Sequence, residues 1–348
     1  MSRELALDTI WLRPTPRLAH TEYSLAYHKE YIRAKTGFDP SDPEAIRRLN
    51  QLWGIDFRWS TNGGLHADWA KRGRATDMGH AVYAADGSDR RLPRRCPFET
   101  PEEVWAFDPA AEYGLPDFQE QVAAYEDAVR NARRNWPEQL TTGGYYPTIV
   151  SGAIQAFGWE MLLLAAADRR KMETVFDRLF RFTLHHMRAW AETSVEVVIQ
   201  HDDFVWSQGA FMRPDIYRKV IIPRFAELWK PLRAAGKKVL FCSDGDFTQF
   251  AAEIVAAGAD GLIFEPMNDF AWMAERFGDS TLLVGSGVDC RDLAFAPWEK
   301  VRAAMDRTFA LARKCKGVIW AVGNHLPANI PDERMDRYIE YLRANWGR

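Results

Sequence analysis

The sequence predicts an α/β protein, a (β/α)8 barrel with an N-terminal helical and hairpin elaboration, on three observations. Its 348 residues are enough for one such barrel. Short apolar runs recur, and a longer amphipathic stretch follows each of them. The runs lack the alternation of half-exposed strands, which indicates parallel strands buried on both faces. These runs are LTTGGYYP (140–147), VEVVIQHDD (195–203), KVLFCSDGD (238–246), DGLIFEP (260–266), TLLVGSGVD (281–289) and GVIWAVGNH (317–325).

The N-terminal third is less regular. Residues 22–35 and 43–53 predict helices, 79–98 predict a hairpin around Asp86 and Gly87, and 116–135 predict a helix that ends before Pro137. Six β/α repeats follow, and eight would close a barrel, so we expect the first two strands within this third.

We therefore expect one domain over residues 1–348, with an irregular part at 1–115 and clear β/α repeats at 116–348. Inside the repeats, Gly236 marks the C-terminal end of one helix and Pro214 lies near the first turn of another.

Composition narrows the class of protein. The chain has 45 Lys and Arg against 48 Asp and Glu, so no global charge favours nucleic acid or an anionic membrane. Its four cysteines form no CxxC pair, which argues against a disulfide framework and fits a reducing compartment. No apolar run approaches the roughly 18 residues of a membrane span. We expect a cytoplasmic protein whose many aromatic residues fill a core and line a pocket.

Residues with useful chemistry lie at the carboxyl end of the predicted strands. In a parallel α/β protein these ends open on one face, and that face carries the site. The residues are His201, Asp202 and Asp203 after one run, Cys242, Asp244 and Asp246 after the next, then Glu265, Asp289 and Cys290, and finally Asn324 and His325.

Ordinary structural roles remain open for several of them. An Asp or Asn after a strand is often a helix cap, which applies to Asp246, Asp289 and Asn324. Glu265 has the alternative of a buried carboxylate held by an arginine. The adjacent carboxylates of Asp202 and Asp203 would repel each other unless a cation, a metal or a proton is shared.

Cys242 and Asp244 have the spacing of a chelating pair. Residues two apart on a strand share a face and lie about 7 Å apart. Thiolate, carboxylate and imidazole together suit Zn²⁺. The alternative is a buried thiol beside a capping aspartate.

Four segments together resemble the uroporphyrinogen decarboxylase superfamily, in the branch of zinc-dependent corrinoid methyltransferases and O-demethylase components. The resemblance covers about 200 residues from Thr142 onward, and the combination is more specific than any single motif. The segments are PTIVSGAIQAFGWEMLLLAAADRRKMETVFDRLFRFT, HDDFVWSQGAFMRPDIYRKVIIPRF, KKVLFCSDGDFTQFAAEIVAAGADGLIFEP and GNHLPANIPDERMDRYI.

The resemblance implies a TIM barrel with its site at the carboxyl ends of the strands. Members of this branch hold zinc with a His-x-Cys pair and a later cysteine; here Cys242 and Asp244 match the pair, and Asn324 or His325 matches the last ligand. The spacing is kept while the ligand types change. The expected metal ligands are therefore Cys242, Asp244, Glu265 and His325.

The decarboxylase itself has an arginine-rich N-terminal signature that holds the acidic side chains of a tetrapyrrole. Residues 15–31 of this chain, TPRLAHTEYSLAYHKEY, supply mainly Arg17, His20 and Lys29 in that place. A substrate with eight carboxylates needs several cations. Uroporphyrinogen decarboxylation is therefore not the expected reaction.

The leading hypothesis is a methyltransferase that moves a methyl group between a small substrate, such as a methoxy-aromatic compound, and the cobalt of a corrinoid. The chain has no D-x-H-x-x-G motif, so the corrinoid is expected on a partner protein. Zinc would assist, and His201, Asp202, Asp203 and Asp246 are the expected catalytic residues. A homodimer is expected from related barrels. The alternatives are a metal-independent decarboxylase or lyase acting on a small acid, and a non-catalytic ligand-binding barrel.

Overall fold

A parallel sheet forms the centre of the computed structural model, which describes residues 1–61, 96, 98–146, 148–323, 326–327 and 329–348. Its strand order is β1-β9-β8-β7-β6-β5-β4, and β2 and β3 form a second parallel pair. The bounds are β1 (Ala19–His20), β2 (Phe57–Arg58), β3 (Leu140–Thr141), β4 (Gly143–Tyr145), β5 (Val197–His201), β6 (Lys238–Cys242), β7 (Gly261–Ile263), β8 (Leu282–Val284) and β9 (Val318–Trp320).

Backbone hydrogen bonds join the two sheets into a ring. The N–H of Asp56, just before β2, donates to the carbonyl of His20 in β1 at 2.9 Å, and the N–H of Leu140 in β3 donates to the carbonyl of Asp56 at 2.9 Å. Only Thr142 separates β3 from β4, so the two occupy one strand position. The described strands thus fill eight positions, and the predicted (β/α)8 barrel is confirmed, with its first two strands in the N-terminal third.

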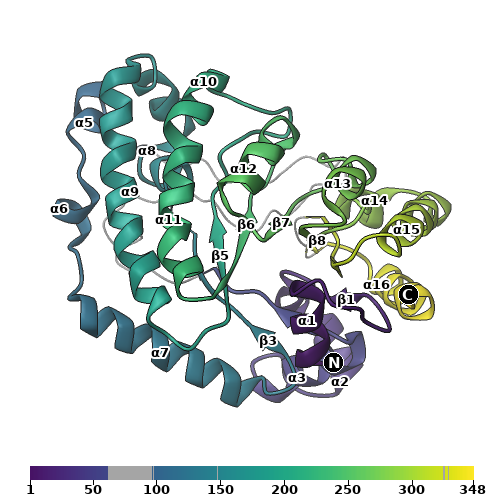
Figure 1. Ribbon diagram of the computed structural model, residues 1–348. Helices are drawn as coiled ribbons and strands as arrows, with labels where there is room; N and C mark the ends of the chain where they lie inside the picture. Colours follow the sequence, from purple (N-terminus) through teal and green to yellow (C-terminus); the bar gives the residue numbers. More distant parts are fainter. Residues whose placement is uncertain (62–95, 97, 147, 324–325, 328) are drawn as a thin grey trace.

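Helices surround the ring (Figure 1). The α-helices are α1 (Arg3–Ile10), α2 (Lys29–Thr36), α3 (Pro43–Trp53), α5 (Pro101–Ala106), α6 (Pro109–Tyr113), α7 (Phe118–Asn135), α8 (Val150–Ala165), α9 (Arg169–Ala191), α10 (Pro214–Ile216), α11 (Ile222–Ala234), α12 (Ala251–Ala257), α13 (Phe270–Phe277), α14 (Cys290–Phe295), α15 (Trp298–Ala312) and α16 (Asp332–Asn345). Shorter turns are η1 (Leu25–Tyr27), the π-helical η2 (Tyr217–Ile221) and η3 (Thr248–Phe250).

The predicted helices are confirmed at 43–53 by α3 and at 116–135 by α7. The helix predicted at 22–35 is too long, because Ser24 has a left-handed backbone (φ 68°) and α2 begins only at Lys29. The predicted hairpin at 79–98 lies outside the described residues, apart from Cys96 and Phe98. No helix in the described part of the chain is long and apolar enough to span a membrane.

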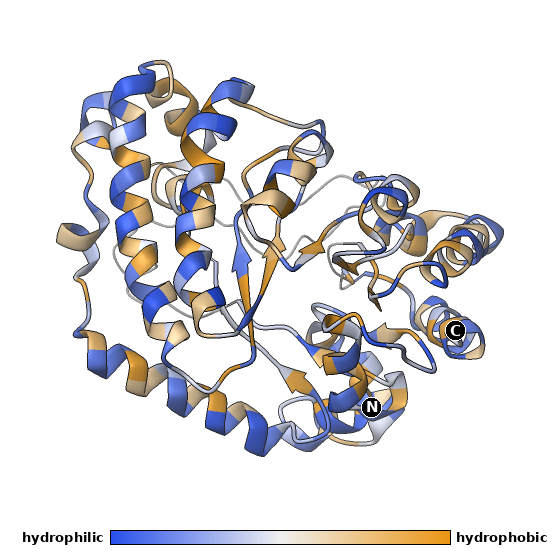
Figure 2. Ribbon diagram, in the orientation of Figure 1, coloured by the Kyte–Doolittle hydropathy of each residue, from blue (hydrophilic) through white to orange (hydrophobic). Residues whose placement is uncertain are grey.

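Two buried clusters reflect the two faces of the strands. Alternate strand residues such as Val197, Ile199, Leu240 and Cys242 fill the barrel interior. The residues between them, such as Val198, pack outward against the helices. In Figure 2 most strands are hydrophobic and the outer helices have one hydrophilic side. The alternation decides which side chains reach the interior at the carboxyl end of each strand.

Candidate functional site

A polar layer lies above the apolar interior where β5 and β6 end. On β5 the interior series Val197 and Ile199 continues to His201, which pairs in register with Cys242, the last residue of β6. Two residues further along each chain are Asp203 and Asp244. The alternation that builds the core therefore also brings this imidazole, thiol and pair of carboxylates to one end of the barrel.

Asp203 is the centre of this layer. Its Oδ1 accepts hydrogen bonds from Nε2 of His201 at 2.8 Å and from the N–H of Asp244 at 2.9 Å. Its Oδ2 accepts one from the hydroxyl of Tyr146 at 2.8 Å, and its own N–H donates to Oγ of Ser151 at 2.6 Å. Asp203 thereby ties together the chain segments after β4, β5 and β6.

Electrostatics favour an ionised Asp203. Burial alone would raise the pKa of this carboxyl, but the charge of His201 and the hydrogen bonds from His201, Asp244 and Tyr146 lower it below its ordinary value. An ionised carboxylate only accepts hydrogen bonds, so Nε2 of His201 carries the proton between them. The pair forms a fixed unit, with side chains 14% and 7% exposed.

His201, Asp203 and Asp244 have the geometry of a metal site. Each offers one ligand atom, and these atoms all lie within 4.8 Å of one another. Ligand atoms about 2.0–2.2 Å from a central zinc ion would have comparable or shorter separations. One imidazole nitrogen and two carboxylate oxygens are donors that zinc and other transition metals accept.

Two of the predicted ligands, Cys242 and Glu265, lie beside this cluster. Cys242 is 3% exposed, and burial followed by the charges of Asp244, Asp203 and Glu265 raises the pKa of its thiol well above the ordinary value. Oε2 of Glu265 accepts a hydrogen bond from the N–H of Gly245 at 2.7 Å. Both side chains line a narrow hollow of about 10 Å³ at the carboxyl ends of β6 to β9, together with Trp59, Ser243, Asp244, Ile263, Phe264, Val284, Gly285, Ala321 and Val322.

The other predicted site residues have different positions. Asp202 points away from the cluster, and its carboxylate accepts hydrogen bonds from the N–H groups that open α8. Burial raises its pKa to about 6, although the hydrogen bonds from Ser151, Thr148 and Val150 oppose this shift. Asp246 accepts a hydrogen bond from the N–H of Thr248 in a turn. Asn324 and His325 lie outside the described residues.

Asp289 has the capping role that the sequence left open. It precedes α14, and its side chain accepts a hydrogen bond from the N–H of Arg291 at 2.7 Å. Two of the three basic residues singled out in 15–31 have partners: Arg17 donates to both oxygens of the buried Asp56 at 2.7 and 2.8 Å. Nε2 of His20 lies 3.1 Å from a carboxylate oxygen of Glu22. Lys29 is exposed.

Three aromatic residues of the site were not singled out from the sequence. Tyr146 holds Asp203, and its ring packs on that of His201 with centroids 4.1 Å apart. Burial, with smaller contributions from charges that include Asp203 and Asp244, raises the pKa of Tyr23 to about 12, so its hydroxyl keeps its proton. Tyr23 packs on Trp59 at 5.1 Å. Tyr146 follows β4 directly, so the strand-end rule that selected His201 would have found it.

Comparisons with known proteins agree with this architecture. The sequence model of the family described as Uroporphyrinogen decarboxylase (URO-D) matches residues 96–344. A methyltransferase from Methanosarcina mazei has a similar structure, with a TM-score of 0.64 and 16% sequence identity over 99% of this chain and 96% of that one. At this identity the similarity establishes a shared fold.

A second solved structure is more distant. A xylose isomerase-like TIM barrel protein from Mycobacterium smegmatis, in complex with magnesium, matches with a TM-score of 0.35 and 11% identity over 65% of this chain and 81% of that one. This score is too low to support an argument. No curated protein matches the chain.

Proposed function

The chain belongs to the uroporphyrinogen decarboxylase family, and from this premise we propose that it is a metal-dependent methyltransferase. It moves a methyl group between a small substrate, for which methoxy-aromatic compounds are the leading class, and the cobalt of a corrinoid on a separate protein. The fold shared with the Methanosarcina mazei methyltransferase supports this choice within the family.

The observation that carries the proposal is the cluster of His201, Asp203 and Asp244, whose ligand atoms all lie within 4.8 Å of one another. Asp244 belongs both to this cluster and to the ligands expected from the sequence. We propose these three residues as metal ligands. Cys242, two residues before Asp244 and facing the barrel interior, would be a fourth donor. In this proposal Glu265 is not a ligand. It holds the loop after β6 in place through the hydrogen bond that it accepts from the N–H of Gly245.

A bound zinc ion would act as a Lewis acid on a substrate oxygen or hold a thiolate in its reactive form. The protein's own residues supply orientation. Asp203 fixes the ring of His201, and Tyr146 and the N–H of Asp244 fix Asp203. Burial raises the pKa of Tyr23 to about 12, so its hydroxyl stays protonated at neutral pH. Trp59 gives the hollow an aromatic wall.

Two measurements test the proposal. Elemental analysis of the purified protein should find about one zinc ion per chain. The visible absorption of free cob(I)alamin should change as it becomes methylated in the presence of protein and methoxy-arenes. Asp244→Asn should lower both zinc content and rate, whereas Asp117→Asn, at the exposed cap of α7, should change neither. A protein without bound metal that transfers no methyl group would overturn the proposal.

A second candidate is a metal-independent decarboxylase or lyase acting on a small acid. The observation in its favour is that His201, Asp203 and Tyr146 already form a hydrogen-bonded chain that can relay a proton. Chelator treatment separates the two candidates, because turnover that survives removal of the metal supports this one. A barrel that only binds a ligand would catalyse neither methyl transfer nor the decarboxylase or lyase reaction.

A further inference from the structure

A hollow of about 420 Å³ lies on the outer side of the barrel, between α7 and the strands β2 and β3. One wall is a single face of α7, because its residues follow helical spacing. That face carries the small side chains of Ala128 and Ala132, which leave the space unfilled. The lining consists of Tyr125, Ala128, Val129, Ala132 and Trp136 on that face, and of Arg58, Ser60, Thr141, Thr142, Trp190 and Val195 opposite.

Arg58 is the charged group of this hollow. Its guanidinium carbon lies 4.0 Å from the centre of a ring of Trp136, and it makes no hydrogen bond or ion pair with any residue in the described part of the chain. Burial lowers its pKa, and no neighbouring charge opposes that effect. A half-buried arginine normally pairs with a carboxylate or a carbonyl oxygen. Among the described residues, Arg58 therefore has a ring contact with Trp136 but no hydrogen-bond acceptor.

Part of the wall of the hollow is aromatic, where Trp190 meets Tyr125 of α7. Trp190 is 4% exposed and stacks on Tyr125, with ring centroids 4.0 Å apart and planes 7° from parallel. Its Nε1 is buried and has no hydrogen-bond partner among the described residues. Stacked rings beside a cation that finds no acceptor among the described residues provide an apolar cavity with a few convergent polar groups, the usual composition of a small-molecule site.

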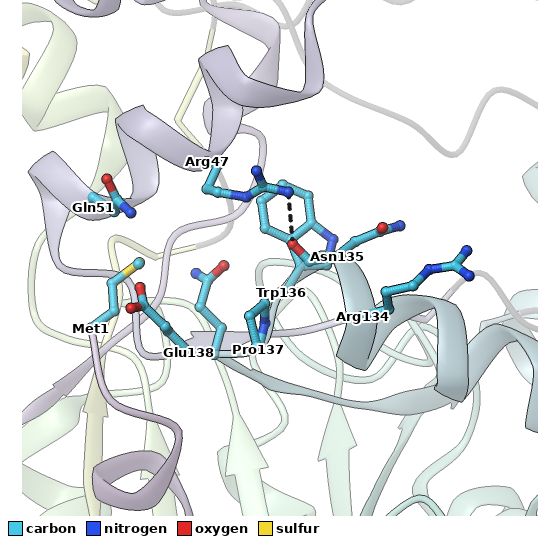
Figure 3. A pocket seen from close by; sticks show the side chains of 9 residues that line it. Met1, Arg47, Gln51, Arg134, Asn135, Trp136, Pro137 and Glu138 are labelled. Carbon is cyan, nitrogen blue, oxygen red and sulfur yellow. Dashed lines mark hydrogen bonds between the residues drawn. The ribbon is translucent and has the colours of Figure 1, made fainter.

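A second hollow, at the end of α7, has arginines that already have hydrogen-bond partners. Trp136 also lines a space of about 370 Å³ at the end of α7, shown in Figure 3. Its two arginines already have partners: Arg47 pairs with Glu44 and donates to the carbonyl of Asn135, and Arg134 donates to Asn131 on its own helix. An anion there would compete with existing contacts, so the Arg58 hollow is the better candidate.

We infer that the Arg58 hollow binds a small aromatic carboxylate. The planar fork of a guanidinium matches the two oxygens of a carboxylate, and Trp136 and Trp190 match an aromatic ring. This site is separate from the barrel interior. Phe57 and Trp59, the neighbours of Arg58, point inward and belong to or pack against the interior cluster, so Arg58 points outward. The inference goes beyond the proposed methyl transfer and does not depend on it.

Isothermal titration calorimetry with benzoate tests the inference. The unmodified protein should bind benzoate saturably, and Arg58→Gln should weaken the affinity by about tenfold or more, because a charge-assisted hydrogen bond is lost. Ala132→Trp should abolish binding by filling the hollow while leaving Arg58 in place. Arg130→Gln is the matched control, because Arg130 is an exposed arginine of α7 outside the lining and should leave the affinity unchanged.

Four outcomes would overturn the inference. The first is benzoate binding that is unchanged in Arg58→Gln, and the second is benzamide binding as tightly as benzoate, since either removes the role of charge. The third is benzoate binding that disappears in Asp244→Asn, because this locates the ligand in the barrel. Absence of saturable binding up to the solubility limit of benzoate counts against it equally. Failure of methyl transfer alone would leave it untouched.

Discussion

Replacing Asp202 gives the sharpest test of the site's construction. This side chain is fully buried after β5, and its oxygens accept hydrogen bonds from the N–H groups of Ile149 at 3.1 Å, Val150 at 3.0 Å and Ser151 at 2.6 Å. The first turn of α8 has no other side-chain cap. In Asp202→Ala, three N–H groups lose their acceptor at a place that water does not reach.

The expected loss of stability follows from these contacts. A buried donor left unpaired costs about 1–3 kcal/mol. Three such donors would lower the free energy of unfolding by about 3–6 kcal/mol, because partial relaxation of the turn recovers some of the loss. Asp202→Asn keeps one oxygen acceptor and no buried charge, so its loss should be about 1–2 kcal/mol. Asp117→Ala is the control, because Asp117 caps α7 with two similar hydrogen bonds at an exposed position and should cost about 1 kcal/mol.

Urea unfolding followed by circular dichroism measures the three free energies, and elemental analysis measures bound metal. If Asp202→Ala costs no more than the Asp117 control, the capping account is wrong. If Asp202→Asn loses metal or turnover while its unfolding free energy is unchanged, Asp202 acts at the site, as the sequence suggested. We expect the opposite result, with normal metal content and reduced stability.

Three further predictions concern neighbouring residues. Tyr146→Phe removes one donor to Asp203 and should weaken metal affinity by about tenfold, measured by competition with a chelator, with a stability change of about 1 kcal/mol or less. Burial lowers the pKa of His28 below 6.5. Its contribution to stability is therefore present above pH 6.5 and is lost as the pH falls toward its folded-state pKa. In urea titrations at several pH values, His28→Gln should reduce this loss of stability at low pH. Gly245→Ala should lower the free energy of unfolding by about 1–3 kcal/mol in the same assay. The φ angle of Gly245 is +84°, and a Cβ there would lie 2.6 Å from the carbonyl oxygen of Trp206. A variant of unchanged stability would contradict this prediction.

The sequence predicts the later strands well and the first two poorly, for a physical reason. From β5 onward each strand is buried on both faces, so its residues form an apolar run that is visible without a structure. The strands β1 and β2 contain two residues each. They are fixed by single backbone hydrogen bonds to segments far away in the chain, and such contacts leave no periodic pattern.

The residues of the candidate site also differ in how well the sequence predicts them. Because strand side chains alternate, His201 with Asp203 and Cys242 with Asp244 could be paired from their spacing, and they lie at the predicted end of the barrel. The same alternation sends Asp202 to the other face, toward α8. Tyr146 donates to Asp203 across 57 residues of chain, and no local pattern specifies such a contact.

The sheet and the first loop residues together bring the cluster to one place. Parallel strands lie about 4.8 Å apart, and His201 and Cys242 are paired in register at the ends of β5 and β6, so Asp203 and Asp244, two residues further along each chain, begin from neighbouring positions. A change from His-x-Cys to Cys-x-Asp then keeps the position while it changes charge. The two carboxylates of the cluster carry two negative charges when ionised, which one divalent cation would balance. Turnover measured before and after removal of the metal therefore decides between the two proposed reactions.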